Sequence, residues 1–304
     1  MAHGTPATPE EIEPFYTSIR RGRPPTPELL ADLVRRYDAL GGTSPLAERT
    51  RCQVVGLAAA LEAAAPGAYT IAYGAKHTTP RIEEGVATLH DQHVGKIIGL
   101  VLTPHQSSLG SGEYLRRAAE SAAATAPPTD FVAIPSWHRA PGFASLLAAR
   151  TAAALDSLAP APRQKTAVFF TAHSLPEKAL AEGDPYPDQV QQSASDIADL
   201  LGFETASPGP GEGVNPGTGG TVAANDPVAA NDTVAANDTG GTSGTSGTND
   251  TSGTSGTGGT GVEWGVAWQS PGRTADPWMG PDLLSEIKRV AADGATSVVV
   301  CPVG

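Results

Sequence analysis

Hydrophobic positions along the chain follow two alternating patterns. Short apolar, β-rich runs predict strands at residues 69–74, 96–103, 131–136, 166–172, 262–268 and 296–302. The longer stretches between them carry apolar residues at helical spacing, which predicts helices at 27–40, 46–64, 80–93, 112–125, 141–158, 187–201 and 281–292. Such alternation is typical of parallel sheets with helices on both faces. We therefore predict an α/β fold.

A Pro-rich segment and a low-complexity tract divide this pattern. The segment Ala159-Pro160-Ala161-Pro162 predicts one α/β domain at 1–160 and a second at 161–203 and 262–304. Residues 204–261 hold repeats of Val-Ala-Ala-Asn-Asp followed by a Gly/Ser/Thr-rich tract. This composition cannot bury enough apolar area to offset the entropy of ordering. We expect 204–261 to be a disordered insertion without chemistry.

Composition and charge narrow the classes of function. Aromatic residues make up only 5% of the chain, so Ala, Val and Leu must supply most of the core. The chain carries 20 basic and 32 acidic residues, and the net charge of −12 repels phosphate backbones. We therefore expect no nucleic-acid partner. A nucleotide-binding α/β protein is also disfavoured, because neither G-x-G-x-x-G after a strand nor G-x-x-x-x-G-K-[ST] occurs.

Cysteine content and the absence of long apolar stretches bear on the cellular location. The two cysteines, Cys52 and Cys301, cannot build a disulfide framework or a Cys-based zinc site, and we interpret both as small buried hydrophobes. The first residues show no signal-peptide pattern, and no apolar stretch approaches the roughly 18 residues of a membrane helix. We expect a soluble, cytoplasmic protein without integral membrane association.

His173 is the first candidate for chemistry. It follows the apolar run at 166–172, where the chain gives way to Ser174, Leu175 and Pro176. Ligands of open α/β sheets bind at the carboxyl ends of strands, and an imidazole there can bind a metal or carry a proton. The alternative is a histidine that only bonds a loop carbonyl.

Candidates for anion binding lie near the N-terminus. Arg20, Arg21 and Arg23 form a basic cluster, and guanidinium groups pair with carboxylates or phosphates. The alternative for this cluster is a solvated basic loop. The Arg36-Tyr37 pair and the loop that holds Ser44 add two more candidates, although Ser44 also suits the N-cap of the following helix.

Several motifs together resemble the ferrochelatase family, most closely the soluble coproporphyrin ferrochelatases of Gram-positive bacteria. Those before the insertion are His-Gly-Thr-Pro at 3–6, Tyr-Thr-x-Ile-Arg-Arg-Gly-Arg at 16–23, Arg-Tyr-x-x-x-Gly-Gly-x-Ser-Pro-Leu at 36–46, Ala-His-Ser-Leu-Pro-Glu-Lys at 172–178 and Gly-Asp-Pro-Tyr-Pro-Asp at 183–188. Those after it are Trp-Gln-Ser at 268–270, Asp-Pro-Trp-Met-Gly-Pro-Asp at 276–282 and Val-Val-Cys-Pro-Val-Gly at 299–304. The resemblance spans the chain except for 204–261. It implies two Rossmann-like, chelatase-type domains with a porphyrin cleft between them.

The resemblance also implies an activity and roles for individual residues. The activity is insertion of Fe(II) into coproporphyrin III in haem biosynthesis, with Fe(II) as a substrate, no further cofactor, and a monomeric enzyme. His173 becomes the catalytic residue and, with His3, a metal ligand. The substrate-binding residues become His3, Arg20, Arg36, Tyr37, Ser44 and Tyr114. His77 and His105 are interpreted as structural or supporting residues.

Two departures from the family pattern shape the expectations. His3 stands where the family usually has a tyrosine, and a histidine there resembles the sirohydrochlorin chelatases, so another metal or tetrapyrrole is an alternative. Family members continue beyond Pro-Val-Gly into an Asp-His-x-Glu segment, whose glutamate partners the cleft histidine, and begin with a strand before the position of Met1. We therefore expect a chain truncated at both ends. An inactive porphyrin-binding relic is a further alternative.

Overall fold

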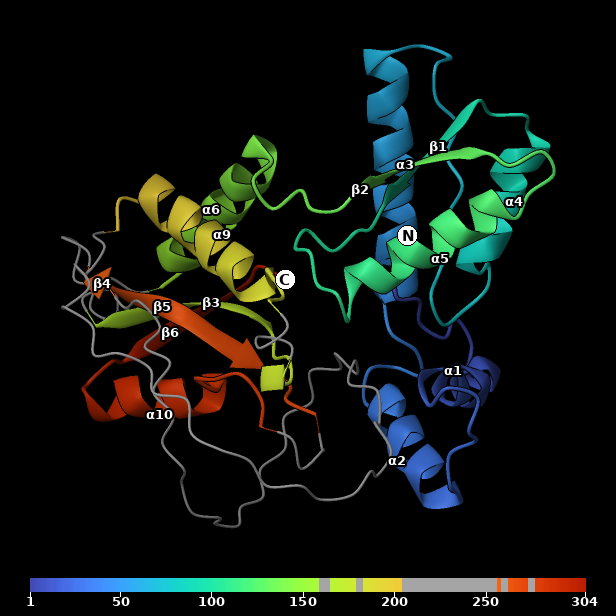
Figure 1. Ribbon diagram of the computed structural model, residues 1–304. Coiled ribbons are helices and arrows are strands. Elements are labelled where there is room, and N and C mark those ends of the chain that lie inside the picture. Colours follow the sequence, from blue (N-terminus) through green and yellow to red (C-terminus); the bar gives the residue numbers. More distant parts are fainter. Residues whose placement is uncertain (159–164, 179–182, 204–255, 258–261, 273–276) are drawn as a thin grey trace. The chain divides into compact units, whose positions relative to one another are not determined.

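The computed structural model describes residues 1–158, 165–178, 183–203, 256–257, 262–272 and 277–304 (Figure 1). The described residues divide into two compact units, with the boundary between Ser136 and Trp137. Most of the insertion predicted at 204–261 lies outside the described residues. Gly256–Thr257, inside that range, forms a short strand, β4, because the edge of β5 (Glu263–Gln269) offers backbone groups with which it pairs.

The first unit contains a small parallel sheet covered on one face by helices. Strands β1 (Lys96–Leu100) and β2 (Asp130–Ile134) pair in parallel. Helix α5 (Ser111–Ala123) packs on both strands and on α4 (Ile82–Asp91). These elements share a hydrophobic core of Ile82, Val86, Ile97, Val101, Tyr114, Leu115, Ala118 and Ala122.

The remaining helices of the first unit precede this sheet in the chain. The 3-10 helix η1 (Pro9–Glu11) leads into α1 (Ile12–Ile19), which packs on α2 (Pro27–Asp38) around a second core. Thr26 caps α2 by accepting a hydrogen bond from the Leu29 amide, and Pro27 occupies its first turn. Helix α3 (Leu46–Ala64) buries only Thr50. Cys52 is therefore exposed, and its prediction as a buried residue was wrong, whereas Cys301 is buried as predicted.

The N-terminal residues run between two other segments of the first unit. Met1 donates to the carbonyl of Leu100 at 2.6 Å and accepts from the amide of Leu102 at 2.9 Å. On the other side, Ala2 forms a parallel bridge with Ala75. The strand predicted at 69–74 was wrong: pairing begins only at Ala75, because residues 69–73 have no strand beside them in the described part of the chain.

The second unit is built on a four-stranded sheet in the order β4-β5-β3-β6. Strand β3 (Thr166–His173) lies between β5 and β6 (Ser297–Pro302) and is parallel to both. Helices α6 (Pro141–Asp156) and α9 (Tyr186–Leu200) cover one face, and α10 (Leu283–Ala292) covers the other (Figure 1). A central parallel strand is buried on both faces, which is why the continuous apolar run at 166–172 identified it.

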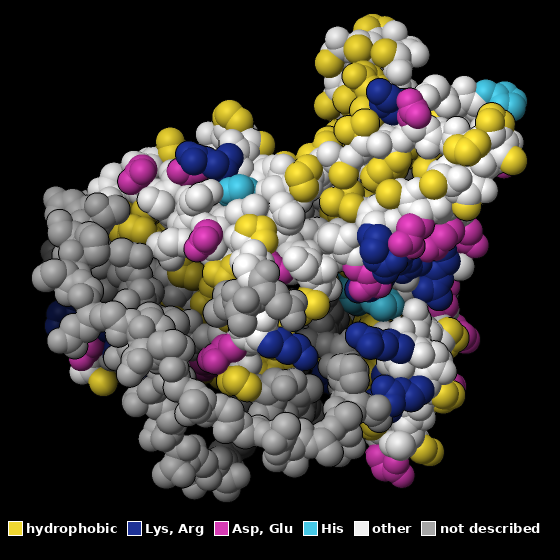
Figure 2. All heavy atoms as spheres, viewed as in Figure 1, with side chains coloured by type: hydrophobic (Ala, Val, Ile, Leu, Met, Phe, Trp, Pro, Cys, Tyr) yellow, Lys and Arg dark blue, Asp and Glu magenta, His cyan; other side chains and the backbone are white. Residues whose placement is uncertain are grey.

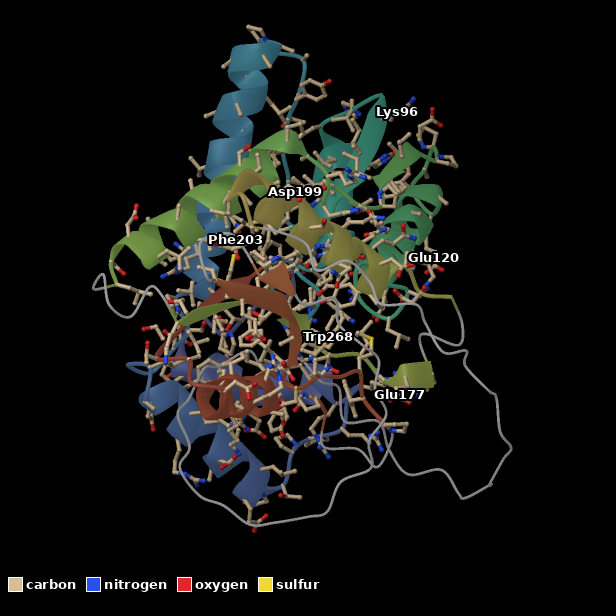
Figure 3. The ribbon with its side chains drawn as sticks, turned by 90° about the vertical axis from the view of Figure 1, so that its left-hand side faces the viewer. Lys96, Glu120, Glu177, Asp199, Phe203 and Trp268 are labelled. Carbon is tan, nitrogen blue, oxygen red and sulfur yellow. The ribbon has the colours of Figure 1, made fainter. Side chains whose placement is uncertain are left out.

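Side chains of β3 alternate between the two layers of this core. Val168, Phe170 and Ala172 pack toward α6 and α9, whereas Ala167 and Phe169 pack toward α10. Trp268 of β5 and Phe203, which follows α9, belong to the first of these layers (Figure 3). Asp282 caps α10 by accepting a hydrogen bond from the Ser285 amide.

These two units confirm the predicted α/β class with parallel sheets, all seven predicted helices and the other five predicted strands, with shifts of a few residues at their ends. The boundary differs from the one predicted near residue 160. Helix α6 belongs to the second unit because Ala144, Leu147 and Ala148 are buried in that unit's core. None of the described helices combines the length and the apolar character needed to cross a membrane.

Candidate active site

His173 is the last residue of β3, at the carboxyl edge of the second unit's sheet. It is half-buried and stands in register with Gln269 of β5. The side-chain amide of Gln269 donates to the hydroxyl of Thr171, which lies two residues before His173 in β3. The predicted position of His173, at the end of a buried strand, is confirmed.

The turn after His173 is held by bonds to a distant segment. The Ser174 amide donates to the carbonyl of Gln269 at 2.8 Å, and the Ser174 hydroxyl donates to the carbonyl of Met279 at 2.9 Å. The amide of Met279 donates to the carbonyl of Leu175 at 2.9 Å. These bonds explain why the motifs at 172–178 and 276–282 occur together: one segment fixes the backbone of the other.

Tyr186 ties the backbone of His173 to the first turn of α9. Its hydroxyl is hydrogen-bonded to the His173 backbone, and its ring lies 5.8 Å from that of Trp268. Burial raises the pKa of Tyr186, and the bond to the His173 backbone offsets only part of that rise. Tyr186 is therefore a neutral phenol that positions the end of β3.

In the first unit, His3 lies against His77. The ring centres are 4.7 Å apart and the ring planes are tilted by 55°. The Nδ1 atom of His3 is 3.0 Å from the carbonyl oxygen of Gly4, and Nδ1 of His77 is 3.1 Å from the hydroxyl oxygen of Ser18. The backbone joins the same residues, because the His77 amide donates to the carbonyl of His3 at 3.0 Å.

Basic side chains surround the His3–His77 pair, and most of them are paired with carboxylates. The Nζ atom of Lys76 is 2.7 Å from Glu113, and Arg117 makes two bonds of 2.8 Å to Glu83. Figure 2 shows basic and acidic side chains gathered together over α4 and α5. The positive charges of Lys76 and Arg117 remain close enough to act on the imidazoles.

Burial and these charges keep both imidazoles neutral. Burial is the main cause that lowers the pKa of His77 to about 3, and the charge that His3 would carry when protonated and the charges of Lys76, Arg81 and Arg117 lower it further. Burial also lowers the pKa of His3. A neutral imidazole keeps a lone pair on one ring nitrogen, which a metal ligand or a proton acceptor needs.

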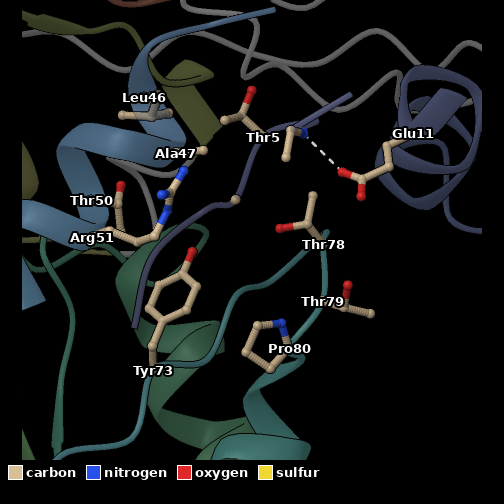
Figure 4. A pocket seen from close by; sticks show the side chains of 12 residues that line it. Thr5, Glu11, Leu46, Ala47, Thr50, Arg51, Tyr73, Thr78, Thr79 and Pro80 are labelled. Carbon is tan, nitrogen blue, oxygen red and sulfur yellow. Dashed lines mark hydrogen bonds between the residues drawn. The ribbon is translucent and has the colours of Figure 1, made fainter. Parts of the chain in front are cut away.

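A small polar cavity of about 180 Å³ lies next to this pair, beyond Gly4 and Thr5 (Figure 4). Hydroxyl groups of Thr5, Thr50 and Thr78 line it, together with the guanidinium group of Arg51. Gly4 has φ +84°, and a Cβ there would overlap the Thr78 hydroxyl oxygen, so a glycine is required where the chain passes between His3 and the cavity.

Two predicted tyrosines adjoin this part of the first unit from inside its cores. Tyr37 is 2% exposed, and its hydroxyl lies 3.4 Å from the Thr5 hydroxyl. Tyr114 is 6% exposed, with Lys76 Nζ 5.3 Å from its ring centre. Burial raises the pKa of Tyr114, so its hydroxyl is uncharged.

The other three predicted residues are engaged locally. The guanidinium group of Arg20 stacks 5.8 Å above the centre of the Tyr16 ring. Arg36 forms an ion pair with Asp32 at 3.1 Å. Ser44 accepts a hydrogen bond of 3.2 Å from the Leu46 amide, but the N-cap residue of α3 is Pro45, so the prediction of Ser44 as the N-cap was wrong by one residue.

The sequence interpretation gave little weight to the residues that surround His3. His77 was interpreted as structural, and Arg81 and Arg117 were not singled out. The Lys76-His77 dipeptide before a Pro-initiated helix was the available signal. Its significance depends on its contact with His3, 74 residues away, which no local pattern reveals. Across the described residues, no group of three or more His, Cys, Asp or Glu side chains could hold a metal ion.

Comparison with known proteins identifies the family. A sequence model described as ferrochelatase matches residues 1–208. The chain belongs to the ferrochelatase family. It is 34% identical over 306 residues to coproporphyrin III ferrochelatase 1 of Bacillus cereus, covering all of this chain and 79% of that protein. It is 31% identical over 304 residues to the ferrochelatase of Herpetosiphon aurantiacus, covering all of this chain and 81% of that protein. The predicted family resemblance is confirmed.

Proposed function

We propose that this ferrochelatase-family chain inserts Fe(II) into coproporphyrin III, as one step of haem biosynthesis. The observation that carries the proposal is the position of His173 at the carboxyl edge of a parallel sheet, in a chain similar over its whole length to coproporphyrin III ferrochelatases. The reaction replaces two pyrrole N–H bonds by bonds from nitrogen to iron. It releases two protons and requires no oxidant or further cofactor.

His173 is proposed as the catalytic residue and a metal ligand. Imidazole binds Fe(II) well, and a neutral imidazole can also accept a pyrrole proton. The bonds from Tyr186 to its backbone and from Ser174 to Met279 fix the strand end from which it projects. His173 therefore keeps one position while the porphyrin is metallated.

The residues of the first unit are proposed to bind the porphyrin and its metal. His3 is proposed as a second metal ligand. Coproporphyrin carries four propionates, for which the guanidinium groups of Arg20 and Arg36 and the hydroxyl of Ser44 are suitable partners. Tyr37 and Tyr114 are proposed to support the same rim by packing, since both side chains are buried.

Metal insertion can be tested anaerobically with Fe(II) and coproporphyrin III, followed by the absorption change of the metalloporphyrin and, separately, by quenching of porphyrin fluorescence on binding. We expect metallation that depends on the protein. His173→Ala should abolish insertion and leave porphyrin binding within about threefold, because the side chain acts on the metal and the protons. His93→Ala, at an exposed histidine, is the matched control and should keep full activity.

Three results would count against the proposal. Turnover of sirohydrochlorin without turnover of coproporphyrin would show that the substrate is a different tetrapyrrole. This is the alternative raised by the histidine at position 3. Tight porphyrin binding without metallation would identify a porphyrin-binding relic. Equal loss of binding and insertion in His173→Ala would make His173 a structural residue.

A further inference from the structure

The His3–His77 pair has the separation expected of two ligands on one metal ion. An imidazole nitrogen lies about 2.1 Å from a bound metal, which places the ring centre about 3.2 Å from it. Two ring centres 4.7 Å apart then correspond to an angle of about 95° at the metal. Adjacent ligands in octahedral and tetrahedral complexes subtend about 90° to 110°. The separation of the ring centres is therefore compatible with one shared ion.

The hydrogen bonds of the pair leave the same nitrogen on each ring for a ligand. Nδ1 of His3 donates to the carbonyl of Gly4, because that oxygen can only accept. His3 must then carry its lone pair on Nε2, as metal-binding histidines do when a carbonyl holds the other nitrogen. Nδ1 of His77 is bonded to the Ser18 hydroxyl, and the tautomer with its lone pair on Nε2 is the one in which Nδ1 donates to that hydroxyl. Among the hydrogen bonds of the described residues, none uses Nε2 of either histidine.

Positive charges near the pair weaken proton binding by His77, and carboxylates offset two of these charges. Lys76 is paired with Glu113 and Arg117 with Glu83, so two of the nearby positive charges are balanced by carboxylates. Arg81 directs its guanidinium group to the Ser18 hydroxyl and the Lys76 carbonyl. Two neutral imidazoles without a carboxylate favour ions that bind nitrogen, such as Fe(II), Co(II) and Zn(II), over Mg(II) and Ca(II).

We propose that His3 and His77 bind one divalent transition-metal ion through their Nε2 atoms, forming a site in the first unit that takes up metal without porphyrin. Water completes the coordination, so the ion exchanges readily. This inference rests on the proposed function in one respect only: the proposed function identifies the bound ion as Fe(II) that is later inserted into the porphyrin. The metal site itself needs no porphyrin and is tested without it.

The test uses Zn(II) as a diamagnetic, air-stable probe and the whole chain carrying His173→Ala, which removes the other proposed metal ligand. Long-range nitrogen–proton NMR of 15N-labelled histidines distinguishes Nδ1 from Nε2 at each ring. We expect the Nε2 resonances of His3 and His77 to shift together along one titration curve. His93, which is exposed, provides the internal reference and should not follow that curve.

Asparagine variants then separate metal binding from folding. His3→Asn and His77→Asn keep an amide near the position of Nδ1, and with it the bond to Gly4 or Ser18, but remove Nε2. Each should weaken Zn(II) binding at least about tenfold in calorimetry, and the double variant should be little worse than either one, since the two ligands act on one ion. His93→Asn is the matched control and should bind as the parent does.

The inference fails if only one of the two Nε2 resonances moves, or if either asparagine variant binds Zn(II) as tightly as the parent. Retained far-ultraviolet circular dichroism in the variants shows that lost binding is not lost folding. Normal Zn(II) binding by the His77→Asn variant would refute this metal site. If the wild-type chain still metallated coproporphyrin, the proposed function would stand.

Discussion

Gly4→Ala should destabilise the segment that holds His3, more than the change of one hydrogen to a methyl group suggests. Gly4 has φ +84°, a conformation that costs an L-residue about 1–2 kcal/mol. A Cβ at this position would also overlap the Thr78 hydroxyl oxygen and lie 3.0 Å from Ala75 Cβ. Relieving such overlap in a packed region costs about 1–3 kcal/mol. The expected total is about 2–5 kcal/mol.

Hydrogen exchange at the amides of Ala75, Lys76 and His77 measures this loss where it occurs. These amides donate to the carbonyls of Pro80, Ala2 and His3, so they open when the segment around Gly4 moves. A loss of about 2–5 kcal/mol predicts exchange faster by about 30-fold to 4000-fold. Tryptophan fluorescence would miss the effect, because all four tryptophans lie in the second unit.

Gly22→Ala is the matched control. Gly22 has φ +83°, almost the same as Gly4, but no atom lies within 4 Å of the Cβ position. The Gly22→Ala variant should lose only the backbone contribution to stability, about 1–2 kcal/mol. Protection from hydrogen exchange at residues 75–77 should not change. Adding Thr78→Ala to Gly4→Ala should recover part of the protection. The reasoning is refuted if both glycine variants lose the same protection, or if the Thr78 change recovers none.

Three further predictions concern the packing around the site. Tyr186→Phe removes the bond to the His173 backbone and should lower the free energy of unfolding of the second unit by about 1 kcal/mol, read from tryptophan fluorescence in urea. Phe170→Ala empties a fully buried position in the same unit and should cost about 3–5 kcal/mol by the same measurement. Arg117→Gln breaks a half-exposed ion pair with Glu83 and should cost less than about 1 kcal/mol, a difference that about 1 M salt largely removes in circular dichroism.

Two of these changes have a control variant in the same unit. Leu200→Ala, at a position 58% exposed at the end of α9, should cost far less than Phe170→Ala; equal losses would mean that the β3 core is not tightly packed. Arg116→Gln breaks the exposed pair with Glu120 and should have almost no effect. Wild-type stability of the Tyr186→Phe variant would show that the hydroxyl does not hold the end of β3. If the stability lost in Arg117→Gln did not depend on salt, the loss would come from packing and not from charge.

Local patterns were sufficient wherever the determinants of structure lie within one element. The run at 166–172 predicted β3 because a parallel strand covered on both faces must be apolar throughout. The helix predicted from residue 27 begins at Pro27 as expected, because the determinants of a helix start, Pro27 and the Thr26 cap, act within one turn. The position of His173 followed directly, since the residue after a buried strand lies at the sheet edge.

Local patterns were insufficient wherever the partner is distant. Residues 69–74 have the composition of a strand, but a strand needs a neighbour, and pairing with the N-terminal segment starts only at Ala75. The boundary between the two domains, predicted near residue 160, also depends on contacts between residues that are distant in the sequence. The Pro-rich segment at 159–162 marks a break in the pattern, whereas the unit to which α6 belongs depends on which core buries Ala144 and Leu147.

His173 and His3, both proposed as metal ligands, are held in physically different ways, and this difference bears on how the site can change. His173 ends a central strand whose side chains fill two core layers, so displacing it would cost packing on both faces of the sheet. His3 lies in a short segment held by backbone bonds to Ala75–His77 and by the close fit of Gly4 against Thr78. Its ring packs against the rings of His77 and Phe15. Position 3 can therefore exchange one ligand type for another at little cost in stability, whereas position 173 cannot move. His3→Tyr should therefore alter the metal preference of insertion without altering the stability of the second unit.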